Sequence, residues 1–385
     1  MKKKIKILRI THTLDPSHGG IATALVDNSI SLLSYGLSVH ILTYDPHNSV
    51  FHKTKKIKII NKGPGYGGYG FSLKLLMWLY RNKDKYDHFI IEGIWQFSTL
   101  LARLFLKKKY SVRIHGQLDP FFSKNFHKRI KKQIYWMLVE KSNLMNSNSI
   151  LLTSKIEKNL INKTYVNTNG IKKSIINDGI LKPEIKKDKV KKNFFKAFPA
   201  LKNQKFLVFV GRFDKKKGLD TLLKAIVKLK KKKIKYKFFI AGKNNSYTKY
   251  LKKFSNENKI DEYIVWSDKL SNDLKWGAIC ASQGTVLASN GENFGIAVVE
   301  SLACSRPVVT TTKVNIYKEI KNYKAGFISN NNAESFEKIL SKFIKIKKKD
   351  LLTLNKNSYK CFNKCFNIAK KNSLGDYIKK QTRYI

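Results

Sequence analysis

The chain has 385 residues, of which 42% are hydrophobic and 12% aromatic, and it carries a formal net charge of +51. This length exceeds what one hydrophobic core usually serves, so we expect two domains, and the apolar content excludes a disordered chain. Only 8 of the 77 basic residues are arginines. Sites that read nucleic-acid bases favour arginine, so no specific nucleic acid is expected as a partner. The lysine excess fits either background composition or attraction to an anionic membrane face or anionic substrates.

The first residues of the chain predict a strand and not a signal peptide. Their semi-apolar stretch is short and is interrupted by Lys6 and Arg9. No run approaches the roughly 18 apolar residues of a membrane-spanning helix. The 4 cysteines, at positions 280, 304, 361 and 365, form no CxxC pair. This fits a reducing cytoplasm, and we interpret the cysteines as packing residues.

Short apolar runs alternate with longer amphipathic ones along the chain, a rhythm typical of βαβ units and a parallel sheet. In the first half the expected strands are residues 5–10, 38–44, 88–94, 111–116 and 149–154, with a helix over 21–34. In the second half the expected strands are residues 205–214, 236–242, 263–268, 284–289 and 306–311, with a helix over 219–232.

The stretch 178–204 between the two series is polar, shows no strand pattern and contains Pro183 and Pro199. We therefore expect one domain at 1–185, a second at 186–365, and a helical tail at 366–385 that packs back on the first domain. Two doubly wound domains in tandem form a cleft, and ligands bind beyond the carboxyl ends of their strands.

A glycine-rich run, "GPGYGGYG" at residues 63–70, contains a formal G-x-G-x-x-G. In a dinucleotide-binding site the first glycine makes the turn directly after the first strand of the fold. Here "NKGP" intervenes and the unit is not the first, so we interpret the run as a loop whose glycines permit positive φ.

The turns after the first strand of each domain carry residues suited to phosphate. Gly19 and Gly20 open the first helix, where a backbone N–H can approach a phosphate closely. In the second domain "GRFDKKKG" places Arg212 directly after a strand and Lys217 just before a helix. These cations, with a helix N-terminus near Phe294 and Gly295, suit a diphosphate, which requires charge-assisted donors.

Two glutamates lie close together in "SNGENFGIAVVESLAC". A carboxylate among small and apolar residues, such as Glu300, requires a partner because its desolvation is costly. If a helix begins near Gly295, Glu300 lies about 7.5 Å inside it at 1.5 Å per residue, and Glu292 precedes it. We expect the carboxylates to be on the order of 10 Å apart, too far for a retaining glycosidase pair but suited to the two ends of one nucleotide-sugar.

Together, this E-x7-E pair, "GRFDKKKG", the Gly-Gly turn and "RIHGQLDP" resemble the GT-B-type retaining glycosyltransferases that include bacterial exopolysaccharide and lipopolysaccharide enzymes. The resemblance covers nearly the whole chain. It implies two Rossmann-like domains facing across a cleft, the first on the acceptor side and the second binding the donor. It also implies transfer of a hexose from a UDP- or GDP-linked sugar to a lipid-linked or oligosaccharide acceptor in cell-surface polysaccharide synthesis.

The resemblance further implies a role for each site residue. Arg212 and Lys217 would stabilise the leaving diphosphate, Glu300 would bind ribose, and Glu292 and His115 would contact the sugar. The donor-binding loop would comprise Asn293, Phe294, Gly295 and Ile296, with backbone N–H groups assisting at the diphosphate. By the same resemblance, the donor phosphate itself would help to take the acceptor proton, so no protein nucleophile or cofactor is expected. No metal is expected either, because the chain lacks an Asp-x-Asp motif and its cations can take that role.

Three positions depart from the family pattern, namely Ser305, Ala288 and Asp268, and they bear on loop geometry and base recognition. Two alternatives remain open at this point. One is a GT-B sugar-nucleotide epimerase, which shares the two-domain architecture. The other is a non-enzymatic protein that binds nucleic acid or other polyanions through its lysines.

The segment 124–144 has an interfacial amphipathic pattern. Apolar residues recur at helical spacing (Phe126, Ile130, Ile134, Met137 and Leu138) and basic residues crowd the remaining faces (Lys124, His127, Lys128, Arg129, Lys131 and Lys132). We expect the apolar stripe to pack on the sheet and the basic rim to face lipid. The protein would then be cytoplasmic and peripheral on the inner face of the cell membrane.

Overall fold

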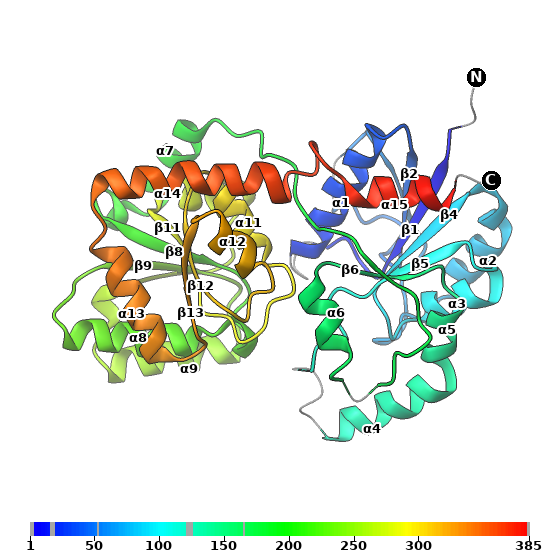
Figure 1. The fold of residues 1–385 in the computed structure, drawn as a ribbon, viewed down its shortest axis with the longest axis horizontal. Helices are drawn as coiled ribbons and strands as arrows, with labels where there is room; N and C mark the ends of the chain where they lie inside the picture. Colours follow the sequence, from blue (N-terminus) through cyan, green and yellow to red (C-terminus); the bar gives the residue numbers. More distant parts are fainter. Residues whose placement is uncertain (1–3, 16–19, 52–53, 121–125, 165, 383–385) are drawn as a thin grey trace. The chain divides into compact units, whose positions relative to one another are not determined.

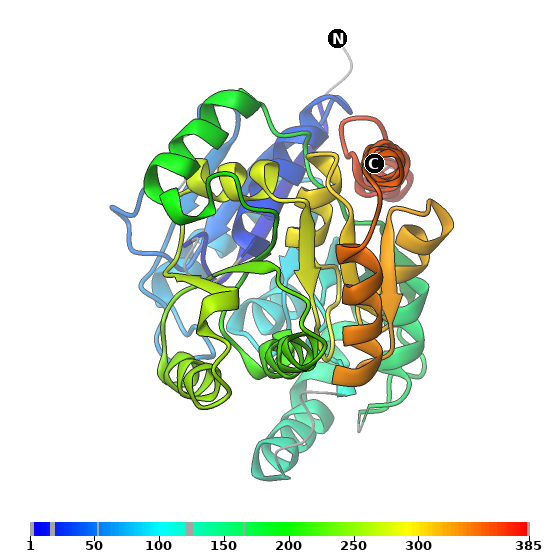
Figure 2. The same cartoon turned by 90° about the vertical axis from the view of Figure 1, so that its left-hand side faces the viewer.

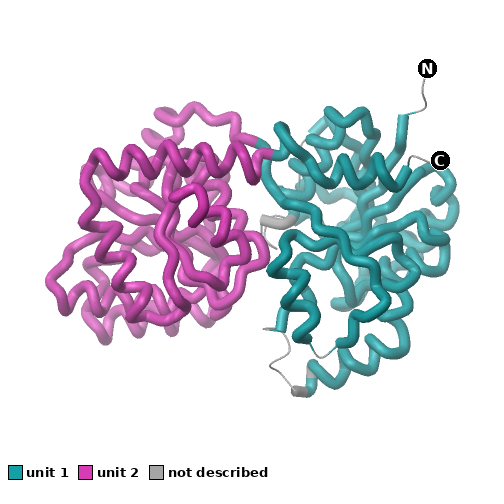
Figure 3. Tube along the Cα trace, viewed as in Figure 1, with its two compact units in different colours: residues 1–181, 368–385 teal, residues 182–367 magenta. Residues whose placement is uncertain are grey.

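The computed structural model of the chain describes residues 4–15, 20–51, 54–120, 126–164 and 166–382. The chain divides into two compact units, Met1–Leu181 with Ile368–Ile385, and Lys182–Asn367 (Figure 3). We call the first domain 1 and the second domain 2. The sequence placed the boundaries after residues 185 and 365, whereas the division falls after 181 and 367.

Domain 1 contains a seven-stranded parallel sheet in the order β3-β2-β1-β4-β5-β6-β7. Its strands are β1 (Lys6–Thr11), β2 (Ser38–Thr43), β3 (Lys58–Asn61), β4 (His88–Glu92), β5 (Tyr110–Arg113), β6 (Ile150–Leu152) and β7 (Lys173–Ile175). The central strands are buried along nearly their whole length, as expected for a parallel sheet that helices cover on both faces.

The helices of domain 1 are α1 (Gly20–Leu33), α2 (Leu73–Asn82), η2 (Lys83–Lys85), α3 (Phe97–Phe105), α4 (Phe126–Tyr135), the π-helix η4 (Trp136–Glu140), α5 (Lys141–Met145), α6 (Lys155–Ile161) and α15 (Ser373–Gln381). On one face of the sheet α2, α3 and η4 bury residues such as Leu75, Leu101 and Trp136. On the other face α1 and α15 pack together through Leu32 and Leu374 (Figure 1).

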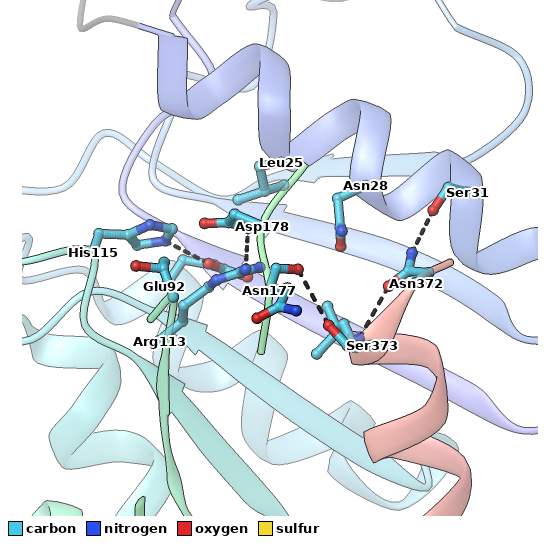
Figure 4. A network of polar contacts seen from close by, with 12 residues as sticks. Leu25, Asn28, Ser31, Glu92, Arg113, His115, Asn177, Asp178, Asn372 and Ser373 are labelled. Atoms are coloured by element: carbon cyan, nitrogen blue, oxygen red, sulfur yellow. Dashed lines mark hydrogen bonds and ion pairs between the residues drawn. The ribbon is translucent and has the colours of Figure 1, made fainter. Parts of the chain in front are cut away.

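The end of the chain completes domain 1. Ile378 of α15 is fully buried against the sheet. Asn372 caps this helix by accepting from the backbone N–H groups of Leu374 and Gly375, and its side chain also bonds to Ser31 of α1 (Figure 4). The described part of the tail, residues 368–382, therefore belongs to domain 1 and contributes to its core.

Domain 2 contains a six-stranded parallel sheet in the order β10-β9-β8-β11-β12-β13. Its strands are β8 (Phe206–Val210), β9 (Lys237–Ala241), β10 (Ile264–Ser267), β11 (Gly284–Leu287), β12 (Val308–Thr311) and β13 (Gly326–Ser329). Its helices are α7 (Lys187–Ala197), η5 (Pro199–Leu201), η6 (Lys215–Lys217), α8 (Leu219–Lys231), α9 (Ser246–Glu257), η7 (Asp261–Tyr263), α10 (Asn272–Ala281), α11 (Ile296–Ala303), α12 (Tyr317–Asn322), α13 (Ala333–Ile344), α14 (Lys348–Cys361) and the π-helix η8 (Phe362–Phe366).

Helices cover both faces of the domain 2 sheet. Figure 2 shows α7, α10, α11 and α14 on one side and α8, α9 and α13 on the other. The expected linker is more ordered than its polar sequence indicated, because α7 lies within it and packs on α10. Phe194 of α7 is fully buried and contacts Phe206 and Phe239 of the sheet.

The structure corrects one expectation about residues 124–144. Residues 121–125 lie outside the described ranges, and α4, η4 and α5 form the rest of the segment. Ile130, Ile134, Met137 and Leu138 do not pack on the sheet but are exposed, whereas Trp136 is buried. The segment carries two apolar rows, and the row that includes the bulky Trp136 fills the core.

Candidate active site

In domain 2 the loop after β8 delivers the expected cations. Gly211 separates Arg212 from the end of β8. Arg212 is exposed, and its guanidinium makes no hydrogen bond or ion pair with any other residue that the structure describes. Asp214 then caps η6 by accepting from Lys216 N at 2.7 Å. Gly218 ends η6 with φ of 69°, and a Cβ there would lie 1.9 Å from the Ala288 carbonyl oxygen. Only glycine therefore allows η6 to lie this close to the end of β11.

The loop after β11 is fastened to η6. Ser289 Oγ and Asn290 N both donate to the Lys216 carbonyl at 2.8 Å. The Lys217 ammonium forms an ion pair with Glu292, and their side chains are 21% and 17% exposed. The cation expected at the diphosphate and the carboxylate expected at the sugar thus lie in direct contact.

Glu292 is fixed through its backbone as well. Its N–H donates to the Lys313 carbonyl, and its carbonyl accepts from Asn315 N, both at 2.9 Å. Gly295, three residues on, has φ of 78° and precedes α11, and a Cβ there would lie 3.3 Å from Glu292 Cγ. The helix start predicted near Gly295 is confirmed.

The buried glutamate of this segment has a partner that the sequence analysis missed. Glu300 lies inside α11 and is 8% exposed. Its Oε1 accepts from the ammonium of Lys275, in α10, at 2.5 Å. In the first turn of α11 the N–H groups of Val298 and Val299 donate to the Gly295 carbonyl at 2.9 and 3.2 Å, whereas a helix offers no such acceptor to its first N–H groups, here those of Ile296 and Ala297. A cation, a carboxylate and polarised N–H groups therefore surround the start of α11.

In domain 1, His115 belongs to a buried charged network (Figure 4). Its Nε2 lies 2.7 Å from Glu92 Oε2, at the end of β4, and Glu92 Oε1 accepts from Arg9 Nε at 2.8 Å. Arg9 also donates to Asn28 Oδ1 at 2.8 Å. Burial would raise the pKa of Glu92, but Arg9, His115 and Arg113 outweigh it and lower that pKa to about 2. Glu92 is therefore ionised at neutral pH, and it orients the His115 ring.

Further contacts fix the loop that carries His115. The residue has φ of 47°, in the left-handed region. Glu157 Oε1 accepts from the next backbone N–H, of Gly116, at 2.9 Å, and its Oε2 accepts from Thr153 N. Burial raises the pKa of Glu157, although these N–H donors oppose the shift. His115 thus stands on a loop with little freedom to move.

The remaining expected site residues fall as follows. Gly19 lies outside the described residues, and Gly20 begins α1. Asn293 Oδ1 accepts from Asn315 Nδ2 at 3.4 Å, and Phe294 packs edge-on against Phe366 of η8.

Sequence reasoning missed Glu92, Arg9 and Lys275. The argument applied to Glu300 would have found Glu92, because it too is a carboxylate within an apolar run, "HFIIEGI". Lys275 gave no comparable signal in a lysine-rich chain. Among the residues that the structure covers, no group of three or more His, Cys, Asp or Glu side chains could hold a metal ion.

The structure also shows the surroundings of the three residues that depart from the family pattern. Ser305 follows α11 with φ of 61°, a conformation that glycine adopts more easily. Ala288 is buried at the close approach of Gly218. Asp268, after β10, accepts from Asn244 N at 3.0 Å and Lys269 N at 2.7 Å, and these hydrogen bonds lower its pKa.

Comparison with known proteins identifies the class of this chain. Residues 190–360 match the family model of the glycosyl transferases group 1. An uncharacterised glycosyltransferase of Methanocaldococcus jannaschii is 27% identical over 339 residues, which are 84% of this chain and 85% of that protein.

Solved structures share the whole two-domain fold. Sucrose-phosphate synthase from Thermosynechococcus elongatus has a TM-score of 0.79 at 17% identity, covering 99% of this chain and 100% of that chain. An Anabaena protein solved in complex with UDP and glucose has a TM-score of 0.75 at 14% identity, covering 99% and 100%. The expected GT-B fold and transferase class are thereby confirmed, and the part of the chain that matches the glycosyl transferases group 1 is residues 190–360, within domain 2.

Proposed function

We propose that the protein transfers a hexose from a UDP- or GDP-linked donor to a lipid-linked or saccharide acceptor, with retention of the anomeric configuration. The acceptor belongs to cell-surface polysaccharide synthesis in this proposal. Support comes from the E-x7-E spacing of Glu292 and Glu300 and from the Anabaena neighbour solved with UDP and glucose.

The observation that carries the proposal is the pair of ion pairs beside the start of α11, Lys217–Glu292 and Lys275–Glu300. The Lys217–Glu292 pair keeps 21% and 17% of its side chains exposed, so an arriving anionic ligand can exchange it at a smaller cost than a fully buried pair. Lys217 then turns from Glu292 to the donor diphosphate, where Arg212 and the first-turn N–H groups of α11 also bind.

Release of Lys217 leaves the Glu292 carboxylate free to accept hydrogen bonds from hydroxyls of the transferred sugar, assisted by Asn293. Glu300 accepts from the ribose hydroxyls with its second oxygen while Lys275 holds the first. In domain 1 we assign the contact with the sugar to His115, whose ring Glu92 orients.

In the reaction the bond between the sugar C1 and the diphosphate oxygen breaks, and the acceptor oxygen bonds to C1 on the same face. The acceptor proton passes to an oxygen of the departing diphosphate. Arg212 and Lys217 stabilise the charge that develops on this leaving group. Such electrostatic stabilisation is usually the largest single contribution to lowering the activation free energy. We further propose that these cations take the role of a divalent ion, so activity should survive EDTA. An enzyme that EDTA silences and Mn²⁺ restores would contradict this.

The experiment is a kinetic comparison of Glu300→Ala with Glu292→Ala on the donor that a thermal-shift panel of UDP-, GDP- and ADP-sugars selects. Loss of Glu300 should raise KM for the donor because the ribose contact exists throughout binding, whereas loss of Glu292 should chiefly lower kcat. Glu334→Ala is the matched control, since Glu334 also pairs with a lysine but lies on α13. Equal small effects at Glu292 and Glu300 would refute the assignment.

A further inference from the structure

Domain 1 exposes large apolar side chains in a way that domain 2 does not. All but two of the exposed large hydrophobic residues in the described chain belong to domain 1; the exceptions are Tyr250 and Leu352. Scattered exposed apolar residues are ordinary, but a contiguous patch marks an interaction surface. The question is whether those of domain 1 gather on one face.

Helix α2 carries the first row. Leu73, Met77 and Tyr80 are 59%, 48% and 56% exposed, at spacings of four and three residues. They lie on the side of the helix opposite the fully buried Leu75 and Leu79. Helix α2 therefore shows an apolar stripe to the outside as well as one to the core.

The second row lies on α4 and η4. Ile130, Ile134, Met137 and Leu138 are 43%, 49%, 61% and 72% exposed. Their spacing places them along one side of this continuous helical segment. Trp136, on the other side, is buried in the core.

Helix α3 connects the two rows. Phe105 of α3 contacts the ring of Tyr80 at 5.6 Å, and Thr99 of α3 donates to Glu140 of η4 at 3.1 Å. Leu104 of α3 is 57% exposed as well. Helices α2, α3 and η4 cover the same side of the sheet (Figure 1). We call the exposed apolar residues of α2, α3, α4 and η4 the α2–α4 face.

The charges around this face are mainly positive, and the exposed Asp84 of η2, directly after α2, is an exception. The sequences of α2, α3, α4 and α5 contain no aspartate or glutamate, and Glu140 of η4 is buried. Exposed cations accompany the apolar rows, including Lys74 and Arg81 on α2, Arg103 on α3 and Lys131 on α4. Apolar side chains rimmed mainly by lysine and arginine match the boundary between anionic headgroups and acyl chains.

We propose that the α2–α4 face binds an anionic lipid bilayer and inserts its apolar side chains below the headgroups. A second copy of the chain is a poor occupant, because two such cationic faces repel each other and offer little opposite charge. The proposal replaces attachment by a basic rim alone: charge attracts the protein, and the apolar rows hold it there.

The test is co-sedimentation of the full chain with phosphatidylcholine vesicles and with vesicles that also contain phosphatidylglycerol, without nucleotide-sugar so that turnover plays no part. We expect binding only to the anionic vesicles, with a fraction that persists at high salt. The variant Met77→Ser/Ile134→Ser/Leu138→Ser should lose the salt-resistant fraction and weaken binding about tenfold or more, since each side chain loses apolar burial.

The matched control is Tyr250→Ser/Leu352→Ser, which removes equally exposed side chains from domain 2 and should bind as the parent does. As a second readout, Leu138→Trp should gain fluorescence quenching by bromine-labelled acyl chains, whereas Leu352→Trp should not. Binding that high salt abolishes completely, or equal binding by the triple serine variant, would overturn insertion. A parent that self-associates, with a monomeric triple variant that still binds vesicles, would instead assign this face to protein contact and overturn the proposal.

Discussion

Domains 1 and 2 are built alike, each as a parallel sheet covered by helices, but they place charge and apolar surface in opposite ways. Domain 1 buries a charged network, in which Arg9 and Glu92 are each 1% exposed, and shows apolar rows on α2 and α4. Domain 2 holds its candidate site charges in partly exposed pairs on loops and helix ends, such as Lys217 with Glu292.

The helices of the two domains also differ in their acidic residues. Every α-helix of domain 2 contains at least one aspartate or glutamate, whereas α2, α3, α4 and α5 of domain 1 contain none. Under the proposed function, the partly exposed pairs of domain 2 suit an anionic ligand that arrives and leaves. The buried network of domain 1 holds the His115 ring in one orientation.

Breaking the buried network of domain 1 should have the largest effect. Glu92→Gln leaves the Arg9 guanidinium buried without a counter-charge, which we expect to cost about 3–5 kcal/mol of unfolding free energy. Glu292→Gln in domain 2 should cost about 1 kcal/mol, because Lys217 can turn to water. Urea unfolding at neutral pH measures both. Similar losses in the two variants would remove the distinction between the domains.

Removing the exposed arginine of domain 2 should leave stability unchanged and reduce catalysis instead. Arg212→Ala withdraws a cation from the proposed diphosphate site, so we expect kcat/KM to fall by about 10²–10³. Lys215→Ala is the control, since Lys215 lies in the adjacent η6 and has no assigned role. Steady-state kinetics and thermal unfolding of each variant separate catalysis from folding, and a fall of less than about fivefold for Arg212→Ala would argue against its role.

A second buried carboxyl group sharpens the comparison within domain 1. Burial raises the pKa of Glu140 to about 7, although Thr99 and Asn143 donate to it and oppose the shift. A folded pKa above the unfolded one means that the unfolded chain loses the proton first, so stability falls as the pH rises from about 4.3 to 7.

Glu140→Gln stays neutral and should avoid this loss. We expect it to equal the parent near pH 4 and to exceed it by on the order of 3 kcal/mol above pH 7. Urea unfolding across this pH range is the measurement, with Glu262→Gln as the exposed control. A constant difference at all pH values would show that Glu140 does not titrate in this window.

The smallest expected effect concerns the turn after α11. Ser305 has φ of 61°, a conformation that costs a residue with a Cβ about 1–2 kcal/mol. Glycine removes this cost, but it also makes the unfolded chain more flexible, which offsets part of the gain in stability. Ser305→Gly should therefore stabilise the protein by about 1 kcal/mol, whereas Ser305→Ala should not. Thermal unfolding of the two variants tests this prediction. A gain in stability for the alanine variant would rule out backbone strain as the cause.

The sequence predicted the parts of this molecule that local pattern determines. The strand rhythm gave both parallel sheets, and the helix start near Gly295 followed from a glycine before an apolar run. The short strands β7 and β13 went unpredicted because they lack a long apolar run. The Lys275–Glu300 contact joins two helices, and nothing in either helix alone indicates it.

The second row of the α2–α4 face illustrates a different limit. Periodicity indicates that an apolar stripe exists, but it does not indicate which of two stripes faces the sheet. In α4 and η4 the core accepts Trp136, which leaves Ile134 and Leu138 exposed. Tertiary packing decides such cases, since the bulkiest side chain gains most from burial.

The most direct test of the account is calorimetric titration of the full chain with UDP, GDP and ADP in EDTA. The account predicts that one of these diphosphates binds, that Arg212→Ala and Lys217→Ala each weaken it by at least about tenfold, and that Lys215→Ala and the triple serine variant of the α2–α4 face leave it unchanged. Failure of all three nucleotides to bind, or equal binding by the parent, Arg212→Ala and Lys217→Ala, would contradict the assignment of the donor site to domain 2.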